Sequence, residues 1–109
     1  MAAGDIFWLD GQSAAGGSTT VQPAAGKTVA ITFIGGIVNG GTAPGLVEAT
    51  SNGTTWRKVA WVANATTVAY DTYGLANAGG RLLINNTNYL RITAPAANTM
   101  DFLVVGVEV

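Results

Sequence analysis

Residues 46–62 read LVEATSNGTTWRKVAWV, two strand-forming runs on either side of a short turn sequence. In each run, alternate positions form two different sets of residues, for example Val47 and Ala49 against Glu48 and Thr50, which is the period of a strand with two different faces. The dipeptide Asn52-Gly53 between them can supply the positive φ angles of a tight type I′ turn. This segment predicts a β-hairpin, and the remaining strands are expected to complete a sheet around it.

Strand-like segments lie on both sides of the hairpin. Residues 28–34 alternate, with Val29, Ile31 and Phe33 on one face, and Gly35-Gly36 then predicts a turn or bulge. Further strands are expected at 67–70, 81–84 and 89–93, with a long loop over 71–80 and the turn of a second hairpin at 85–88. Because no run shows the 3.6-residue period of a helix, the sequence predicts an all-β fold over residues 28–109. Seven to eight short strands are typical of an antiparallel β-sandwich or jelly-roll-like domain.

Residues 1–27 differ from the rest in composition. Alanine, glycine and serine dominate residues 11–26, so this stretch has few large apolar groups to order it, and we expect an extended N-terminal arm. Its one apolar group is Ile6, Phe7, Trp8 and Leu9. Two interpretations stay open: these residues form a first strand on the sandwich, or they anchor the arm on a neighbouring subunit, since aromatic residues dominate interface hot spots.

The last segment, MDFLVVGVEV over residues 100–109, is apolar on both faces for most of its length. A strand with one face in water normally carries polar residues there, so this pattern predicts a strand covered on both sides. We assign Phe102 and Val104 to the core. Leu103, Val105 and Val107 then belong either to the opposite layer or to an interface between subunits.

Composition excludes several classes of function. The chain of 109 residues has no cysteine and no histidine, which removes disulfides, thiolate chemistry and the commonest general base and metal ligand. Only a tenth of the residues are charged, and the net charge of −1 gives little attraction to nucleic acid. No apolar run reaches the roughly 20 residues of a membrane span, and the first residues lack the basic region of a signal peptide. We therefore expect no catalytic, cofactor or metal site, and neither a nucleic-acid nor a membrane partner.

Two groups of residues could still carry chemistry. Glu48, Asp71 and Asp101 could supply a glycosidase-like carboxylate pair, but acidic residues scattered singly among strands are typical of the solvated face of a sheet. Exposed aromatic residues could instead stack on sugar rings, and the residues considered for such a patch are Trp61, Tyr70 and Tyr73. Trp56 and Trp61 have opposite parity on one strand, so at least one of them is expected in the core or in an interface.

The run from Glu48 to Trp56, followed by Tyr89-Leu90-Arg91-Ile92-Thr93 and a closing apolar strand, resembles the "S-x-D-G-x-x-W … Y-h-R-h" pairing (h, apolar). That pairing is found in discoidin-like jelly rolls and in small β-sandwich proteins of tailed bacteriophages. Asn52 stands where the pattern usually has Asp. A chain of this size and composition, with an apolar-tipped arm, also resembles the capsid decoration (cement) proteins of these phages.

The resemblance implies a non-enzymatic virion structural protein, made in the host cytoplasm, that binds the major capsid protein on the outer capsid surface and stabilises the lattice, usually as a homotrimer. The residues expected in its interfaces are Ile6, Phe7, Trp8, Leu9, Leu103, Val105 and Val107. Two alternatives stay open. The chain could be a tail or fibre component, or a glycan-binding β-sandwich module.

Overall fold

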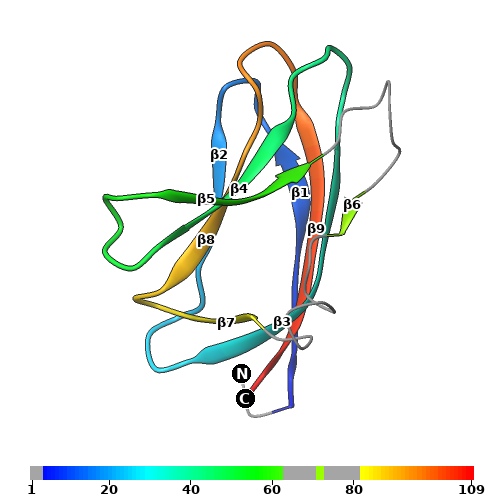
Figure 1. Cartoon of the computed structure of the whole chain (residues 1–109). Coiled ribbons are helices and arrows are strands. Elements are labelled where there is room, and N and C mark those ends of the chain that lie inside the picture. Colours follow the sequence, from blue (N-terminus) through cyan, green and yellow to red (C-terminus); the bar gives the residue numbers. More distant parts are fainter. Residues whose placement is uncertain (1–3, 63–70, 73–81) are drawn as a thin grey trace.

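The computed structural model describes residues 4–62, 71–72 and 82–109, with the backbone alone described for residues 60–62 and 71–72. These residues form two antiparallel sheets packed face to face, so the expected all-β sandwich is confirmed (Figure 1). The described part contains no helix, and therefore none that is long and apolar enough to cross a bilayer.

The first sheet has five strands in the order β1-β9-β3-β6, with β7 also paired to β3. Its strands are β1 (Ile6–Ser13), β3 (Thr28–Val38), β6 (Asp71–Thr72), β7 (Leu82–Asn85) and β9 (Met100–Glu108). The second sheet has four strands in the order β2-β8-β4-β5. These are β2 (Ser18–Val21), β4 (Gly45–Thr50), β5 (Arg57–Val62) and β8 (Tyr89–Thr93).

The hydrophobic core lies between the two sheets. Its buried apolar side chains come from alternate positions of each strand, because successive residues of a strand point to opposite faces. The first sheet contributes Val29, Ile31, Ile34, Val38, Ile84, Met100, Phe102 and Val104, and the second contributes Val21, Val47, Leu90 and Ile92. The assignment of Phe102 and Val104 to the core is confirmed.

The N-terminal segment is part of the sandwich, so the expectation of an extended arm over residues 1–27 is wrong for the residues described. β1 pairs with β9 along its whole length, from Ile6↔Val107 to Ser13↔Met100, and β2 pairs with β8 in the other sheet. The physical reason is backbone pairing: eight residues of an antiparallel ladder hold this segment without many large side chains. Of the two interpretations, the first strand is the one that the structure contains.

The central hairpin is present, with β4 paired to β5 from Gly45↔Val62 to Ala49↔Arg57. Its turn is wider than predicted, because β5 begins only at Arg57. Asn52 does not adopt a positive φ, whereas Gly53 does, at 79°, so the predicted type I′ turn is wrong. The Asn52 side chain organises the loop instead: its Oδ1 accepts hydrogen bonds from the backbone N–H groups of Thr54 and Thr55, at 2.9 and 2.8 Å.

Two other turns differ from expectation. Gly35 and Gly36 do not end their strand, since β3 continues through both to Val38 and pairs there with β6 and β9. Asn85 caps the predicted turn at 85–88, because its Oδ1 accepts hydrogen bonds from the backbone N–H groups of Thr87 and Asn88. That turn, however, connects different sheets, because β7 pairs with β3 and β8 pairs with β4. The second hairpin is therefore an arch between the sheets.

A β-bulge reverses the faces of β3. The pairing with β9 shifts between Ile31 and Phe33, so that one extra residue, Thr32, is inserted. Val29 and Ile31 share one face as predicted, and that face is the core, but beyond the bulge Ile34 takes the inner face. Phe33 lies on the outer face with 37% of its surface exposed, which contradicts its predicted parity. The strand predicted at 67–70 and most of the loop at 71–80 lie outside the described residues.

Candidate interaction surface

The outer face of the five-stranded sheet carries the apolar residues that the core does not use. Strand pairing places Trp8, Val105 and Phe33 in one row across β1, β9 and β3. A second row runs from Ile6 through Val107 and Ala30 to Leu83 on β7. We call this surface the outer apolar face and define it as Ile6, Trp8, Phe33, Leu83, Leu103, Val105 and Val107.

Several of these side chains are open to solvent. Ile6 is 69% exposed, Trp8 61%, Leu83 55% and Phe33 37%, while the residues of β9 between them are half-buried. With roughly 200 Å² for each large side chain, these four residues alone expose on the order of 450 Å² of apolar surface. The largest apolar patch of a typical monomer is about 300–600 Å² and often functional. This face therefore has the size of an interaction site.

Two features give the outer apolar face a defined shape. The indole Nε1 of Trp8 donates a hydrogen bond to Asp10 Oδ2 at 2.8 Å, which restricts how the ring is turned. Beside Phe33, the absence of a side chain at Gly35 leaves a hollow of about 410 Å³ that is also lined by Leu103. Projecting rings beside a hollow give a surface against which the side chains of a partner can pack.

Among the described strands, β1 is also an edge of its sheet, since it is the first in the order β1-β9-β3-β6. An edge strand presents unpaired N–H and C=O groups on one side, to which another chain can pair unless charges or proline prevent it. The sequence of β1, IFWLDGQS, has Asp10 as its single charge and no proline. The edge and the outer apolar face meet along this strand.

The outer side of the four-stranded sheet is polar and internally paired. Glu48 Oε1 accepts hydrogen bonds from Arg91 Nε at 2.9 Å and from Thr93 Oγ1 at 2.7 Å. The guanidinium carbon of Arg91 lies 4.2 Å from the ring centroid of Trp56, whose ring meets that of Tyr89 edge to face at 5.6 Å. These five residues connect β4, β8 and the hairpin loop.

This cluster explains the charge state of Glu48. The Arg91 hydrogen bond holds the pKa of the carboxyl below its ordinary value, and this effect outweighs burial, which raises the pKa. Arg91 and Glu48 are direct cross-strand neighbours on β8 and β4, and their side chains form an ion pair. Glu48 is only 7% exposed, so it is not on a freely solvated face, and its ion pair makes it a structural residue. No group of three acidic residues that could hold a metal occurs among the described residues.

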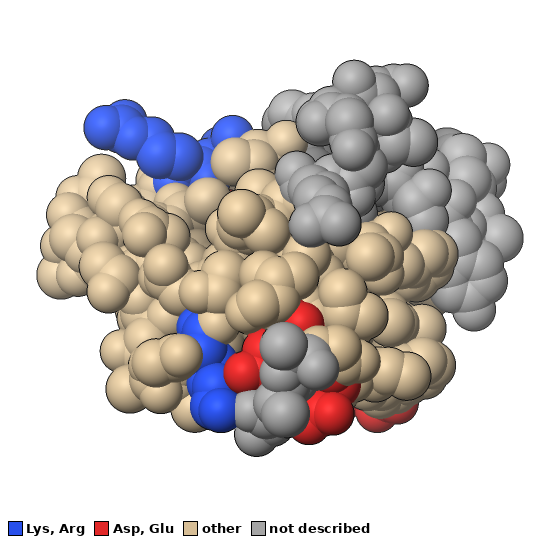
Figure 2. Space-filling model, turned by 90° about the horizontal axis from the view of Figure 1, so that it is seen from below, with Lys and Arg blue, Asp and Glu red and all other residues tan. Residues whose placement is uncertain are grey.

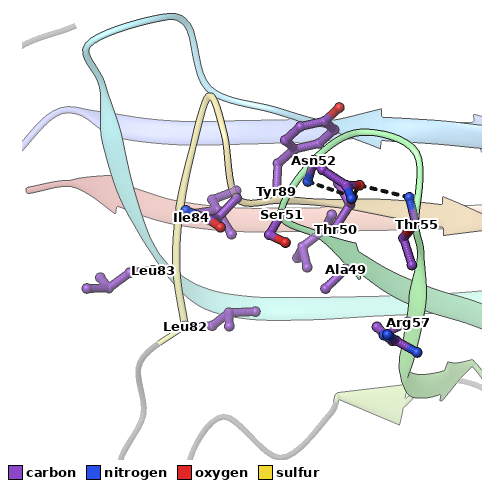
Figure 3. Close-up of a pocket in the computed structure, with 12 residues that line it drawn as sticks. Ala49, Thr50, Ser51, Asn52, Thr55, Arg57, Leu82, Leu83, Ile84 and Tyr89 are labelled. Carbon is purple, nitrogen blue, oxygen red and sulfur yellow. Dashed lines mark hydrogen bonds between the residues drawn. The ribbon is translucent and has the colours of Figure 1, made fainter.

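A cleft opens between the two sheets at the hairpin end of the sandwich (Figure 3). Its volume is about 460 Å³, and it lies between the hairpin loop and the β7–β8 arch. Ala49 and Leu90 line it from one sheet, and Leu82 and Ile84 from the other. Sequence reasoning missed this cleft because it depends on the arch, which brings the short strand β7 opposite the hairpin.

The predicted interface residues separate into two groups. Ile6, Trp8, Leu103, Val105 and Val107 come together on the outer apolar face, on the paired strands β1 and β9. Phe7 and Leu9 point inward and pack against the core. Sequence reasoning missed Phe33 and Leu83. The outward position of Leu83 could have been inferred from the sequence, because it lies between two inward-facing residues of β7. That of Phe33 could not, because it depends on the bulge in β3.

The structure does not test the three aromatic residues proposed for sugar stacking. Tyr70, Tyr73 and the side chain of Trp61 lie outside the described residues. Trp56 is half-buried, and one of its ring faces is already covered by Arg91. Charged side chains are sparse on the end of the molecule shown in Figure 2, where they form a few separate groups.

Comparison with known proteins shows a likeness of fold. No family model matches the sequence, and no curated protein matches it. A solved structure of Bacillus endospore appendages, described as a novel family of disulfide-linked pili, contains a similar chain. The TM-score is 0.57 at 16% sequence identity, and the match covers 95% of this chain and 83% of that chain. The resemblance to phage decoration proteins and discoidin-like domains stays a prediction.

Proposed function

We propose that this chain is a non-enzymatic structural subunit that works by packing its outer apolar face against neighbouring proteins in a larger assembly. The observation that carries the proposal is the double row of apolar side chains across β1, β9, β3 and β7, with Trp8 61% exposed on the edge strand. Burying such a surface is the main source of free energy in protein association. The edge strand β1 adds backbone pairing as a second means of attachment.

In its finer form, the proposal places the chain on the outer surface of a tailed-phage capsid, bound to the major capsid protein and associated as a trimer. The sequence resemblance supports this form. The fold likeness to a pilus subunit supports a different one, in which copies of the chain assemble with each other. This chain has no cysteine, so a self-assembled form would be held by packing and hydrogen bonds rather than by disulfides. A tail or fibre component is a further form of the same proposal.

The experiment compares two substitutions of exposed apolar residues on opposite sheets. Trp8→Ser removes the largest side chain of the outer apolar face, and Val59→Ser removes a side chain that is 54% exposed on β5 of the other sheet. We expect sedimentation velocity to show association of the purified chain, or its co-sedimentation with undecorated capsids, and to show its loss in Trp8→Ser alone. Electron microscopy of the wild-type sample separates filaments from decorated shells.

Three results would contradict the proposal. A wild-type chain that is monomeric and binds no capsid would remove its basis. Equal association of Trp8→Ser and wild type would move the interface elsewhere, and loss in Val59→Ser alone would assign it to the four-stranded sheet. The glycan-binding alternative depends on Trp61, Tyr70 and Tyr73, whose side chains lie outside the described part of the chain.

A further inference from the structure

The cleft between the hairpin and the β7–β8 arch has an apolar interior. Leu82 and Ile84 of β7 face Ala49 and Leu90 of the other sheet across it, and all four side chains pack in or against the hydrophobic core. The cleft is a place where the two sheets separate and the core reaches the surface. Its volume of about 460 Å³ is within the range of small-molecule sites, roughly 300–1,000 Å³.

One cation stands at the mouth of this apolar space. Arg57 is paired with Ala49 in the β4–β5 ladder, so its side chain lies on the inner side of the sheet and lines the cleft. Its neighbour Lys58 is paired with Glu48 and lies on the outer side. Within the described part of the chain, the guanidinium of Arg57 has no carboxylate partner, whereas Arg91 and Lys27 each have one.

The remaining polar groups of the cleft lie on its rim. Asn52 belongs to the hairpin loop and Asn88 to the arch, and Figure 3 shows Asn52 and Thr55 on one side of the opening with Leu82 and Ile84 across from them. The Oδ1 atom of Asn52 is already used by the loop backbone. Arg57 is the one charged residue among those described in the lining of the cleft, and guanidinium groups bind carboxylates with two parallel hydrogen bonds.

The lining decides between classes of ligand. A sugar needs several polar partners and a flat aromatic face. The interior here is aliphatic, and Tyr89, the aromatic residue among those described in the lining, already meets the ring of Trp56 edge to face. An apolar chain suits the interior, and an anionic head suits the rim. We infer that the cleft binds an amphiphilic carboxylate of medium length, with its apolar tail between Leu82 and Leu90 and its carboxylate on Arg57. This inference is independent of the proposed function, because the cleft and the outer apolar face share only Leu83.

The test uses octanoate and octanol as matched probes with the full chain. Methyl resonances of Leu82, Ile84 and Leu90 are followed by NMR during titration with each probe. We expect octanoate to shift these methyl groups and to bind about fivefold more tightly than octanol, which is the gain typical of an ion pair at an open rim. In Arg57→Gln this preference should vanish, while the weaker binding of octanol remains.

Lys58→Gln is the matched control, because it removes the same charge one residue away on the opposite side of β5. It should keep the preference for octanoate. The inference is overturned if octanoate binds no better than octanol, if Lys58→Gln loses the preference as fully as Arg57→Gln, or if the shifts appear at Trp8 and Val105 in place of the cleft. Since Arg57 is exposed, its replacement leaves the fold intact, which circular dichroism verifies.

Discussion

Val104 and Val105 are neighbours on β9 with opposite surroundings, and replacing each with Asp separates the core from the outer apolar face. Val104 is fully buried between the sheets, whereas Val105 is half-buried between Trp8 and Phe33 on the outside. The two substitutions change the same side chain into the same charge. Any difference between them therefore reports the environment.

The expected magnitudes differ severalfold. At Val104, an unpaired carboxylate replaces a fully buried side chain, which costs several kcal/mol, a large part of the 5–15 kcal/mol that holds a domain of this size together. At Val105 the lost burial is about half a side chain, roughly 1 kcal/mol, and the lost cross-strand contacts add about 0.5–1 kcal/mol. Val104→Asp should therefore unfold the chain, and Val105→Asp should leave it folded.

Two measurements on Val104→Asp and Val105→Asp distinguish a core position from an interface position. Urea unfolding followed by circular dichroism gives the stability of each variant, and light scattering after size exclusion gives its mass. We expect Val105→Asp to be a β-rich monomer that has lost attachment to its partners. If Val105→Asp unfolds as completely as Val104→Asp, the outer apolar face is part of an intramolecular core. If it stays folded and fully associated, this face is not where the chain attaches.

Three further predictions concern stability. The pKa of Glu48 is lowered chiefly by Arg91, so its pairing stabilises the fold above about pH 4.3, and this contribution is lost on acidification below that value. The urea midpoint of Glu48→Gln should therefore depend less on pH between 3 and 6 than that of wild type. Identical pH profiles would contradict this. Gly106→Ala should cost about 1–3 kcal/mol in urea unfolding, because its new Cβ would lie 2.5 Å from a backbone oxygen. The control Gly11→Ala should be tolerated, because the nearest atom to its new Cβ is a ring carbon at 3.4 Å. Equal costs would show that the strands adjust. Asn52→Ala should cost about 1 kcal/mol, because it loses two hydrogen bonds from the backbone and one from the Thr50 hydroxyl. Asn52→Asp should restore most of this stability, as differential scanning calorimetry can measure.

The extent to which the fold could be predicted depends on how local its causes are. The hairpin at 46–62 and the strand at 100–109 were predicted because their patterns depend only on neighbours in sequence. The bulge at Thr32 could not be, since it is a property of the pairing between β3 and β9. Gly35 and Gly36 look like a turn in sequence, yet in the sheet they pair with β6 and β9.

In the candidate site, too, some features follow from neighbours in sequence and others from strand pairing. Leu103, Val105 and Val107 were singled out from alternation alone, and they do share one face. Trp8 joined them only because β1 pairs with β9, a contact between segments almost a hundred residues apart. No local pattern reports such a contact, and the low content of large side chains in residues 11–26 suggested an arm instead. The cleft at Arg57 depends likewise on which sheet receives β7.

The position of β9 in its sheet has a consequence for the order in which the molecule can form. β9 lies between β1 and β3, and it is the last of the described strands in sequence. During synthesis β1 and β3 leave the ribosome well before β9, and neither can complete its ladder without it, whereas β2, β4, β5 and β8 can already associate. Pairings of such long sequence separation fold slowly, and strands that wait unpaired are prone to wrong association. In the nascent chain, β1 and β3 are therefore expected to keep their β9-facing edges unpaired until residues 100–108 emerge.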